Sequence, residues 1–90
     1  MDAVPVPGEI LAVPERVIVA PAVGVFRPLG DNDGDATGEV IAAGQAIGVV
    51  EGPGASTPVR SPFGGFLVAM LARAGERVRE GQPVAWLRLT

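Results

Sequence analysis

The side chains that most often carry enzyme chemistry are almost all missing from this sequence of 90 residues. It has no histidine, cysteine or tyrosine, and its seven positive charges are all arginine, so it also has no lysine. General acid–base catalysis at neutral pH favours histidine or a tuned glutamate or lysine, and a nucleophile needs an adjacent base. Only two serines are present, Ser56 and Ser61, and the ten carboxylates are spread over turns. We therefore expect no catalytic residue and no enzymatic activity of the chain's own.

One segment resembles a calcium-binding loop in its spacing of oxygen ligands. Asp31, Asp33 and Asp35 alternate with Asn32 and Gly34, as the first ligands of such a loop do. The remainder of the pattern fails, because an alanine replaces the glycine of the sharp turn and another replaces the glutamate at the twelfth position. We expect a solvated acidic loop and no metal site, with weak millimolar calcium binding as the alternative.

A second segment, Gly52-Pro53-Gly54, has the glycines of a loop that could cradle a phosphate. Such loops precede a helix or use a lysine, and this sequence offers neither after the segment. A plain reverse turn fits better, with Pro53 at the second position and Gly54 at the third position of a type II turn. We therefore expect Glu51 to Pro58 to form a tight hairpin near the middle of the chain.

Composition favours a small all-β domain. Hydrophobic residues make up 48% of the chain, but only three phenylalanines and one tryptophan are aromatic, so the core must be aliphatic. The 13 glycines and nine prolines suit short strands joined by tight turns. We expect the chain to consist of a proline-rich extended arm over residues 1–14 and one folded domain over residues 15–90. Glu9–Val13 could add an edge strand to that domain, although a loosely attached tail is the favoured interpretation.

Charge and hydropathy exclude two classes of partner. The formal net charge is −3 and the arginines are scattered singly, whereas a nucleic-acid-binding protein is expected to show a basic stripe. No apolar run approaches the roughly 18 residues that span a membrane, and the first residues lack the positive region of a secretory signal. We expect a cytoplasmic protein that binds neither nucleic acid nor membrane.

Two halves of the sequence repeat one another. Residues 20–26 match residues 61–67 at an offset of 41, and residues 38–47 match residues 75–84 at an offset of 37. Each copy contains a strand, a proline, a second strand that begins at glycine, a loop, a Gly-Gln turn and a last strand. Each copy must cover the half-buried face of the other. The repeat therefore predicts a flattened β-sandwich of two four-stranded antiparallel sheets, related by an approximate two-fold axis.

The core is expected to come from alternate apolar positions of these strands. Trp86 is harder to place. The repeat pairs it with Val49, which suggests an outward position, but a tryptophan in a small domain is more often part of the core. We therefore expect Trp86 in the core and leave the outward position open. The candidates for the rest of the core are Val17, Val19, Phe26, Ile41, Ile47, Val50, Val59, Leu67, Val78, Val84 and Leu87.

The spacing of these motifs resembles the biotinyl/lipoyl carrier domain family, and within it the biotin carboxyl carrier proteins of acetyl-CoA carboxylase. The resemblance covers about residues 16–89. It is carried by Ala20-Pro21-x-x-Gly24-x-Phe26, by Gly38-x-x-Ile41-x-x-Gly44-Gln45-x-Ile47-x-x-Val50-Glu51, by Gly65, and by Gly75-Glu76-x-Val78-x-x-Gly81-Gln82-Pro83. The resemblance implies the barrel-sandwich hybrid fold of that family.

The family pattern departs at one place. Carrier domains have Glu-Ala-Met-Lys-Met at the central hairpin, and the lysine bears the prosthetic group. This chain has Glu51, Gly52, Pro53, Gly54 and Ala55 there, which puts Gly54 at the position of the acceptor lysine and removes both flanking methionines. The resemblance therefore implies a domain with no attached cofactor. The loop at Pro28–Thr37 occupies the place of the thumb of biotin carriers.

A carrier domain without its lysine keeps only its ability to dock on other proteins. The resemblance implies an accessory or regulatory component of an acyl-CoA carboxylase-type, biotin-dependent complex, at most a non-catalytic subunit of the carboxylase. The alternative is an orphan structural domain that serves as scaffold in an unrelated complex. A weak homodimer is also left open. The candidate contacts with a protein partner are Asp31, Asp33, Asp35, Pro53 and Trp86.

Overall fold

The computed structural model describes residues 14–29 and 38–89, and within these ranges all regular structure is β-strand. The expected edge strand at Glu9–Val13 and the three aspartates of the acidic loop lie outside the described residues. The strands are β1 (Glu15–Val19), β2 (Gly24–Pro28), β3 (Val40–Ile41), β4 (Ala46–Gly52), β5 (Ala55–Arg60), β6 (Gly65–Met70), β7 (Arg77–Val78) and β8 (Pro83–Leu89).

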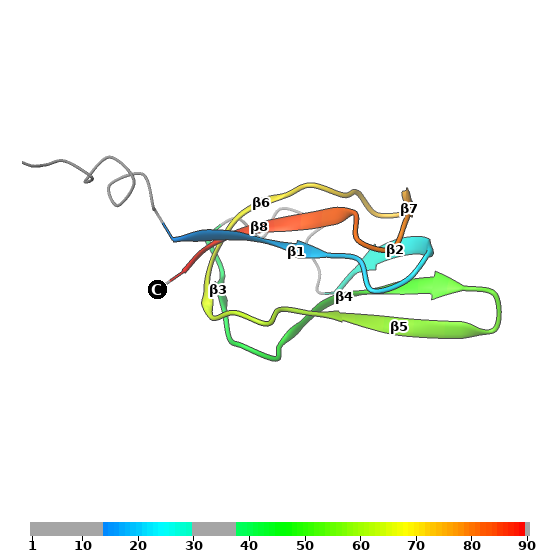
Figure 1. Ribbon diagram of the computed structural model, residues 1–90, viewed down its shortest axis with the longest axis horizontal. Coiled ribbons are helices and arrows are strands. Elements are labelled where there is room, and N and C mark those ends of the chain that lie inside the picture. The colour runs from blue at the N-terminus through cyan, green and yellow to red at the C-terminus, as the bar shows by residue number, and fades with distance from the viewer. Residues whose placement is uncertain (1–13, 30–37, 90) are drawn as a thin grey trace, which may run out of the picture.

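The eight strands form two four-stranded antiparallel sheets, which confirms the predicted fold class. Sheet A has the strand order β1-β8-β6-β3, and sheet B has the order β5-β4-β2-β7. The two sheets pack face to face, and the turn between β4 and β5 extends beyond the neighbouring strands at one end of the molecule (Figure 1). The start of β1 and the end of β8 lie at the opposite end (Figure 1).

The internal repeat is visible in the strand order itself. Replacing β1, β8, β6 and β3 by their repeat partners β5, β4, β2 and β7 converts the order of sheet A into that of sheet B. The turns repeat as well. The Oε1 atom of Gln45 accepts a hydrogen bond from the backbone N–H of Ala42 at 2.9 Å, and Oε1 of Gln82 accepts one from Arg79 at 3.0 Å. The two copies are therefore built on one frame.

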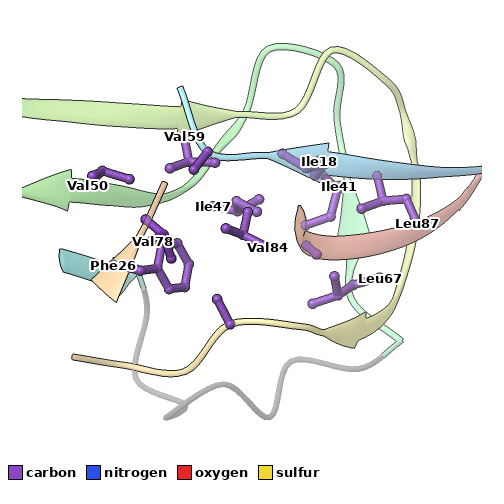
Figure 2. Close-up of a cluster of buried hydrophobic side chains, with 13 residues drawn as sticks. Ile18, Phe26, Ile41, Ile47, Val50, Val59, Leu67, Val78, Val84 and Leu87 are labelled. Atoms are coloured by element: carbon purple, nitrogen blue, oxygen red, sulfur yellow. The ribbon is translucent and has the colours of Figure 1, made fainter. Parts of the chain in front are cut away.

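The core follows the same symmetry. Val84 and Ile47 lie at its centre, and the remaining labelled side chains are distributed on either side of them (Figure 2). Phe26 of one copy corresponds to Leu67 of the other, both fully or almost fully buried. Nine of the predicted core residues are confirmed as buried: Phe26, Ile41, Ile47, Val50, Val59, Leu67, Val78, Val84 and Leu87.

The prediction for β1 was wrong, because it put the outward side of this strand into the core. Val17 and Val19 are 46% and 43% exposed, whereas Ile18 between them is 1% exposed. Successive side chains of a strand point to opposite faces. Since Ile18 points inward, Val17 must point outward, where it lies opposite Trp86 in the β1–β8 register.

Candidate functional site

The β4–β5 hairpin ends in a bare two-residue turn. Gly52 and Ala55 are the last paired residues, and Pro53 and Gly54 form the turn between them. Gly54 has φ of +75°, as the third residue of a type II turn requires. A Cβ atom at Gly54 would meet no other atom within 4 Å. The tip is thus exposed and points away from the rest of the domain, but it presents no functional side chain.

The end of β4 that leads into the hairpin tip is held by β2, and we call this part the base of the tip. Arg27 Nε lies 2.6 Å from Glu51 Oε1, in an ion pair whose side chains are both about half exposed. Exposed pairs of this kind contribute at most about 1 kcal/mol, so this contact orients the two side chains more than it stabilises the fold. Gly24 of β2 packs so closely that a Cβ there would overlap the carbonyl oxygen of Glu51. The position of the hairpin is therefore set mainly by close backbone packing.

A shallow depression of about 420 Å³ lies beside this base, lined by Val23, Arg77, Val78, Arg79 and Gln82. A Cβ at Gly52 would lie 3.1 Å from the carbonyl oxygen of Val23, so the depression adjoins the residue that begins the tip. Nε2 of Gln82 donates to Oε2 of Glu76 at 3.3 Å. This contact, together with the hydrogen bond that Gln82 Oε1 accepts from the backbone N–H of Arg79, fixes the side-chain amide of Gln82 in place. Two guanidinium groups beside an apolar floor can bind a carboxylate of a partner.

Sequence reasoning missed these two arginines. Each looks isolated in the sequence, and their place beside the hairpin comes from two strand pairings: β7 pairs with β2, and β2 pairs with β4. A signal was nevertheless present in the repeat. At the positions that match Arg77 and Arg79, the first copy has Val40 and Ala42. The repeated fold does not require charged side chains at these positions, so the two arginines are a feature of the second copy alone.

The candidate contact residues do not form one site. Pro53 lies at the exposed tip of sheet B. Trp86 lies on β8 in sheet A, and the expectation that it belongs to the core was wrong: its side chain is 36% exposed. In β8 the neighbours Ala85 and Leu87 point inward, so Trp86 must point outward. The outward position that the repeat suggested is correct. Asp31, Asp33 and Asp35 fall outside the described residues.

The described residues offer no alternative chemistry. Ser61 is fully buried, and its Oγ donates to the carbonyl oxygen of Phe63 at 2.6 Å and accepts from its N–H at 3.1 Å. No group of three or more potential metal ligands occurs among residues 14–29 and 38–89. Nor does this part of the chain contain a helix that could cross a membrane. What the described surface offers at the hairpin end is an exposed tip with an arginine-lined depression beside it.

Three solved structures of similar fold are longer proteins, of which this chain spans between 6% and 23%. A urea carboxylase from Kluyveromyces lactis superimposes with a TM-score of 0.68 at 20% identity, over 81% of this chain and 6% of that one. A single-chain, multi-domain long-chain acyl-CoA carboxylase gives 0.71 at 21%, over 84% and 7%. An aspartoacylase family protein from Mesorhizobium loti gives 0.64 at 23%, over 82% and 23%. At these identities the likeness shows the fold alone.

Among curated proteins, no sequence matches this one significantly. The biotin/lipoyl family model, described as "Biotin-requiring enzyme", matches residues 16–87, which include all of β2 to β7 and most of β1 and β8. With the fold, the internal repeat and the central hairpin in agreement, the chain belongs to the biotinyl/lipoyl domain family.

Proposed function

We propose that this protein is a carrier-like module that bears no prosthetic group and acts by binding another protein. The observation that carries the proposal is the hairpin tip. Gly54 stands where the family has its acceptor lysine, and the sequence contains no lysine at any other position. Because biotin and lipoate are attached to a lysine amine in this family, the residues of the chain do not fit covalent attachment of either group.

The geometry of the hairpin supports loss of the acceptor without loss of the frame. Gly54 has the open surroundings that a projecting side chain would need, and its positive φ is one that glycine adopts more easily than a residue with a side chain. Since an acceptor at this position would support no core contact, its replacement by glycine costs the fold little. Pro53 restricts the backbone of the tip, and the resulting stiff, narrow hairpin could enter a cleft of a partner without delivering a reactive group.

The partner we propose is a biotin-dependent carboxylase of the acyl-CoA type, in which this chain serves as an accessory or regulatory component. Membership of the biotinyl/lipoyl family supports this choice. Docking would use the hairpin tip together with the adjoining depression, where Arg77 and Arg79 would meet carboxylates of the partner. The acidic segment Asp31–Asp35 would steer the approach to a basic surface, with an effect that is screened beyond about 8 Å at physiological salt.

Affinity purification from the protein's own cells tests this proposal. The tagged chain is expected to recover carboxylase subunits, which streptavidin detects through their biotin and mass spectrometry identifies. An Arg77→Glu, Arg79→Glu variant should lose most of this recovery. An Asp31, Asp33, Asp35→Asn variant should lose it partly, and less so at high salt. Ala42→Glu changes the exposed position that matches Arg79 in the first copy, away from the hairpin, and serves as the control. If no carboxylase subunit is recovered at either low or high salt concentration, the proposal is rejected.

One observation favours a second candidate, a structural domain within an unrelated assembly. The fold also occurs in an aspartoacylase family protein, where it spans 23% of the chain. That name does not refer to a biotin-dependent reaction, so the fold need not imply a carboxylase. In this case the chain would co-purify with one fixed partner that carries no biotin, and the arginine variant would still bind it.

A further inference from the structure

The large apolar side chains that lie exposed on strands are all in one sheet. In the described part of the chain, sheet A carries five of them and the strands of sheet B carry none. The others, Val23, Leu29 and Leu71, lie in connections between strands. Exposed single apolar residues are common, but a group of them on one face marks a surface that another molecule covers. The five residues are Val17, Val19, Val40, Phe66 and Trp86.

These side chains are adjacent on the outer face of sheet A. Val17 lies directly opposite Trp86, and Val40 lies directly opposite Phe66. The two pairs are joined through β8, where Arg88 is opposite Phe66 and stands two residues from Trp86. Residues two apart on a strand share a face. The five residues therefore form one surface, which we call the apolar face, and Phe66 and Val40 on it are 44% and 64% exposed.

The frame of the domain does not require this composition. At the matching positions of sheet B, Val49 replaces Trp86, Val25 replaces Phe66 and Arg77 replaces Val40. Val25 and Val49 are partly buried, and sheet B forms the same strand pairings as sheet A. An aromatic side chain half in water adds little to the stability of a monomer. Trp86 and Phe66 are, however, residue types that dominate protein interfaces.

We propose that the apolar face is the interface of a homodimer, in which two copies pack sheet A against sheet A. Charge favours a second copy as the occupant. The strands that form the face carry one carboxylate and one guanidinium on its surface, Glu15 and Arg88, which are paired at 2.9 Å. Two such faces do not repel one another, and a two-fold axis allows each arginine to meet the glutamate of the other copy. On sheet B, Arg27, Arg60 and Arg77 face outward against the single Glu51, so two copies of that face would repel.

The size of the face sets the strength of the dimer. Four strands about 4.8 Å apart and a β8 of seven residues at about 3.3 Å each give a footprint of a few hundred Å² per copy. Stable interfaces bury about 800 Å² per partner, so this one should be weak, with dissociation constants in the micromolar to millimolar range. Such a dimer leaves the hairpin end of sheet B free for another protein.

The single tryptophan makes the proposal measurable, because Trp86 lies in the interface itself. Sedimentation equilibrium from about 10 μM to 1 mM should show a monomer that becomes a dimer. Over the same range the Trp86 emission should move to shorter wavelength, and acrylamide should quench it less. Phe66→Glu should weaken association at least tenfold, because it places a charge in the interface of both copies. Val25→Glu makes the matching change on sheet B and should associate as the wild type does.

Circular dichroism of each variant checks that it is folded, and Val40→Glu replaces Phe66→Glu if the latter is not. A wild type that stays monomeric at 1 mM with unchanged Trp86 quenching would overturn the proposal. So would a dimer that survives both Phe66→Glu and Val40→Glu, or one that only Val25→Glu disrupts. Binding of a different protein to the apolar face of a monomeric wild type would also overturn it, since the occupant would then not be a second copy.

Discussion

Sheets A and B share one frame and differ in what that frame presents. In sheet B, β4 and β5 are joined by the turn at Pro53 and Gly54, whereas the matching strands β8 and β1 of sheet A carry no turn between them. The outer face of sheet B carries arginines beside the hairpin, and that of sheet A carries Trp86, Phe66 and valines. Since the same backbone accepts both compositions, these differences are better explained by contacts with other molecules than by folding.

The largest expected effect is a gain of biotinylation at the β4–β5 hairpin, which has no counterpart in sheet A. Replacing Gly52–Ala55 by Ala-Met-Lys-Met should turn a chain that a biotin ligase does not modify into a substrate, because the acceptor and both flanking methionines are restored together. Gly54→Lys alone should remain a poor substrate. A Cβ at position 52 would lie 3.1 Å from the Val23 carbonyl oxygen, so the graft requires a shift of only a few tenths of an ångström. Ligation in vitro followed by streptavidin blotting measures both variants.

Efficient biotinylation of Gly54→Lys would show that the flanking residues matter less than we argue. Failure of the four-residue graft, in a variant that circular dichroism shows to be folded, would mean that the hairpin differs from the family in more than its sequence. In that case the resemblance to carrier domains would extend to the fold and not to the acceptor site.

The next effect is a loss of stability at two matching glycines, and it tests whether the two copies pack in the same way. A Cβ at Gly24 would overlap the carbonyl oxygen of Glu51, and one at the matching Gly65 would overlap that of Arg88. Backbone atoms cannot move aside cheaply, so Gly24→Ala and Gly65→Ala should each lower the free energy of unfolding by about 3 kcal/mol. For a domain of this size, the melting temperature should fall by on the order of 15 °C.

Gly54→Ala serves as the control, because its Cβ meets nothing and only the positive φ opposes it, at a cost of about 1 kcal/mol. Thermal denaturation followed by circular dichroism compares the three variants. If Gly24→Ala and Gly65→Ala differed by more than about 2 kcal/mol, the two copies would not be equivalent in packing.

A smaller effect on the free energy of unfolding is expected at Gly48, where the two copies differ inside the core. A Cβ at Gly48 would lie 2.7 Å from the Phe26 ring, whereas the matching Ala85 keeps its methyl group in a copy that has Leu67 in place of the phenylalanine. Gly48→Ala should therefore cost about 2 kcal/mol, and Phe26→Leu should recover roughly half of it. The recovery is partial because the Arg27 carbonyl oxygen also lies close, at 2.8 Å. Urea denaturation of both single variants and the double variant gives the coupling, and strict additivity would contradict this explanation.

Most of the fold could be predicted because the repeat constrains it twice. Turn residues and the two offsets predicted the order of strands and turns in each copy, and from that the two four-stranded sheets. Periodicity failed for β1, because Arg16-Val17-Ile18-Val19 has apolar side chains on both faces of the strand. The repeat could have corrected this, since it matches Ile18 with Val59, which was assigned to the core. The prediction for Trp86 was also wrong, because it was based on the size of the side chain, and size does not determine the direction in which a strand residue points.

The candidate site could be predicted only in part. The hairpin and the identity of residue 54 follow directly from the sequence, because a two-residue turn is a local feature. The depression beside it does not, because Arg77 and Arg79 reach the hairpin through two non-local strand pairings: Val25 of β2 pairs with Glu51 of β4 and with Arg77 of β7. Local sequence patterns carry no record of such neighbours. Only the comparison of the two copies, with Val40 and Ala42 at the matching positions, points to these arginines.

The most direct test of the central claim is the intact mass of this protein, purified from the cells that produce it while biotin and lipoate ligases are active. We predict that residues 1–90 carry no added group, because Gly54 has no side-chain amine and the sequence contains no lysine. Within the same sample, streptavidin should detect carboxylase subunits but not this chain. A mass increase that matches a biotinyl or lipoyl group on this chain would contradict the account.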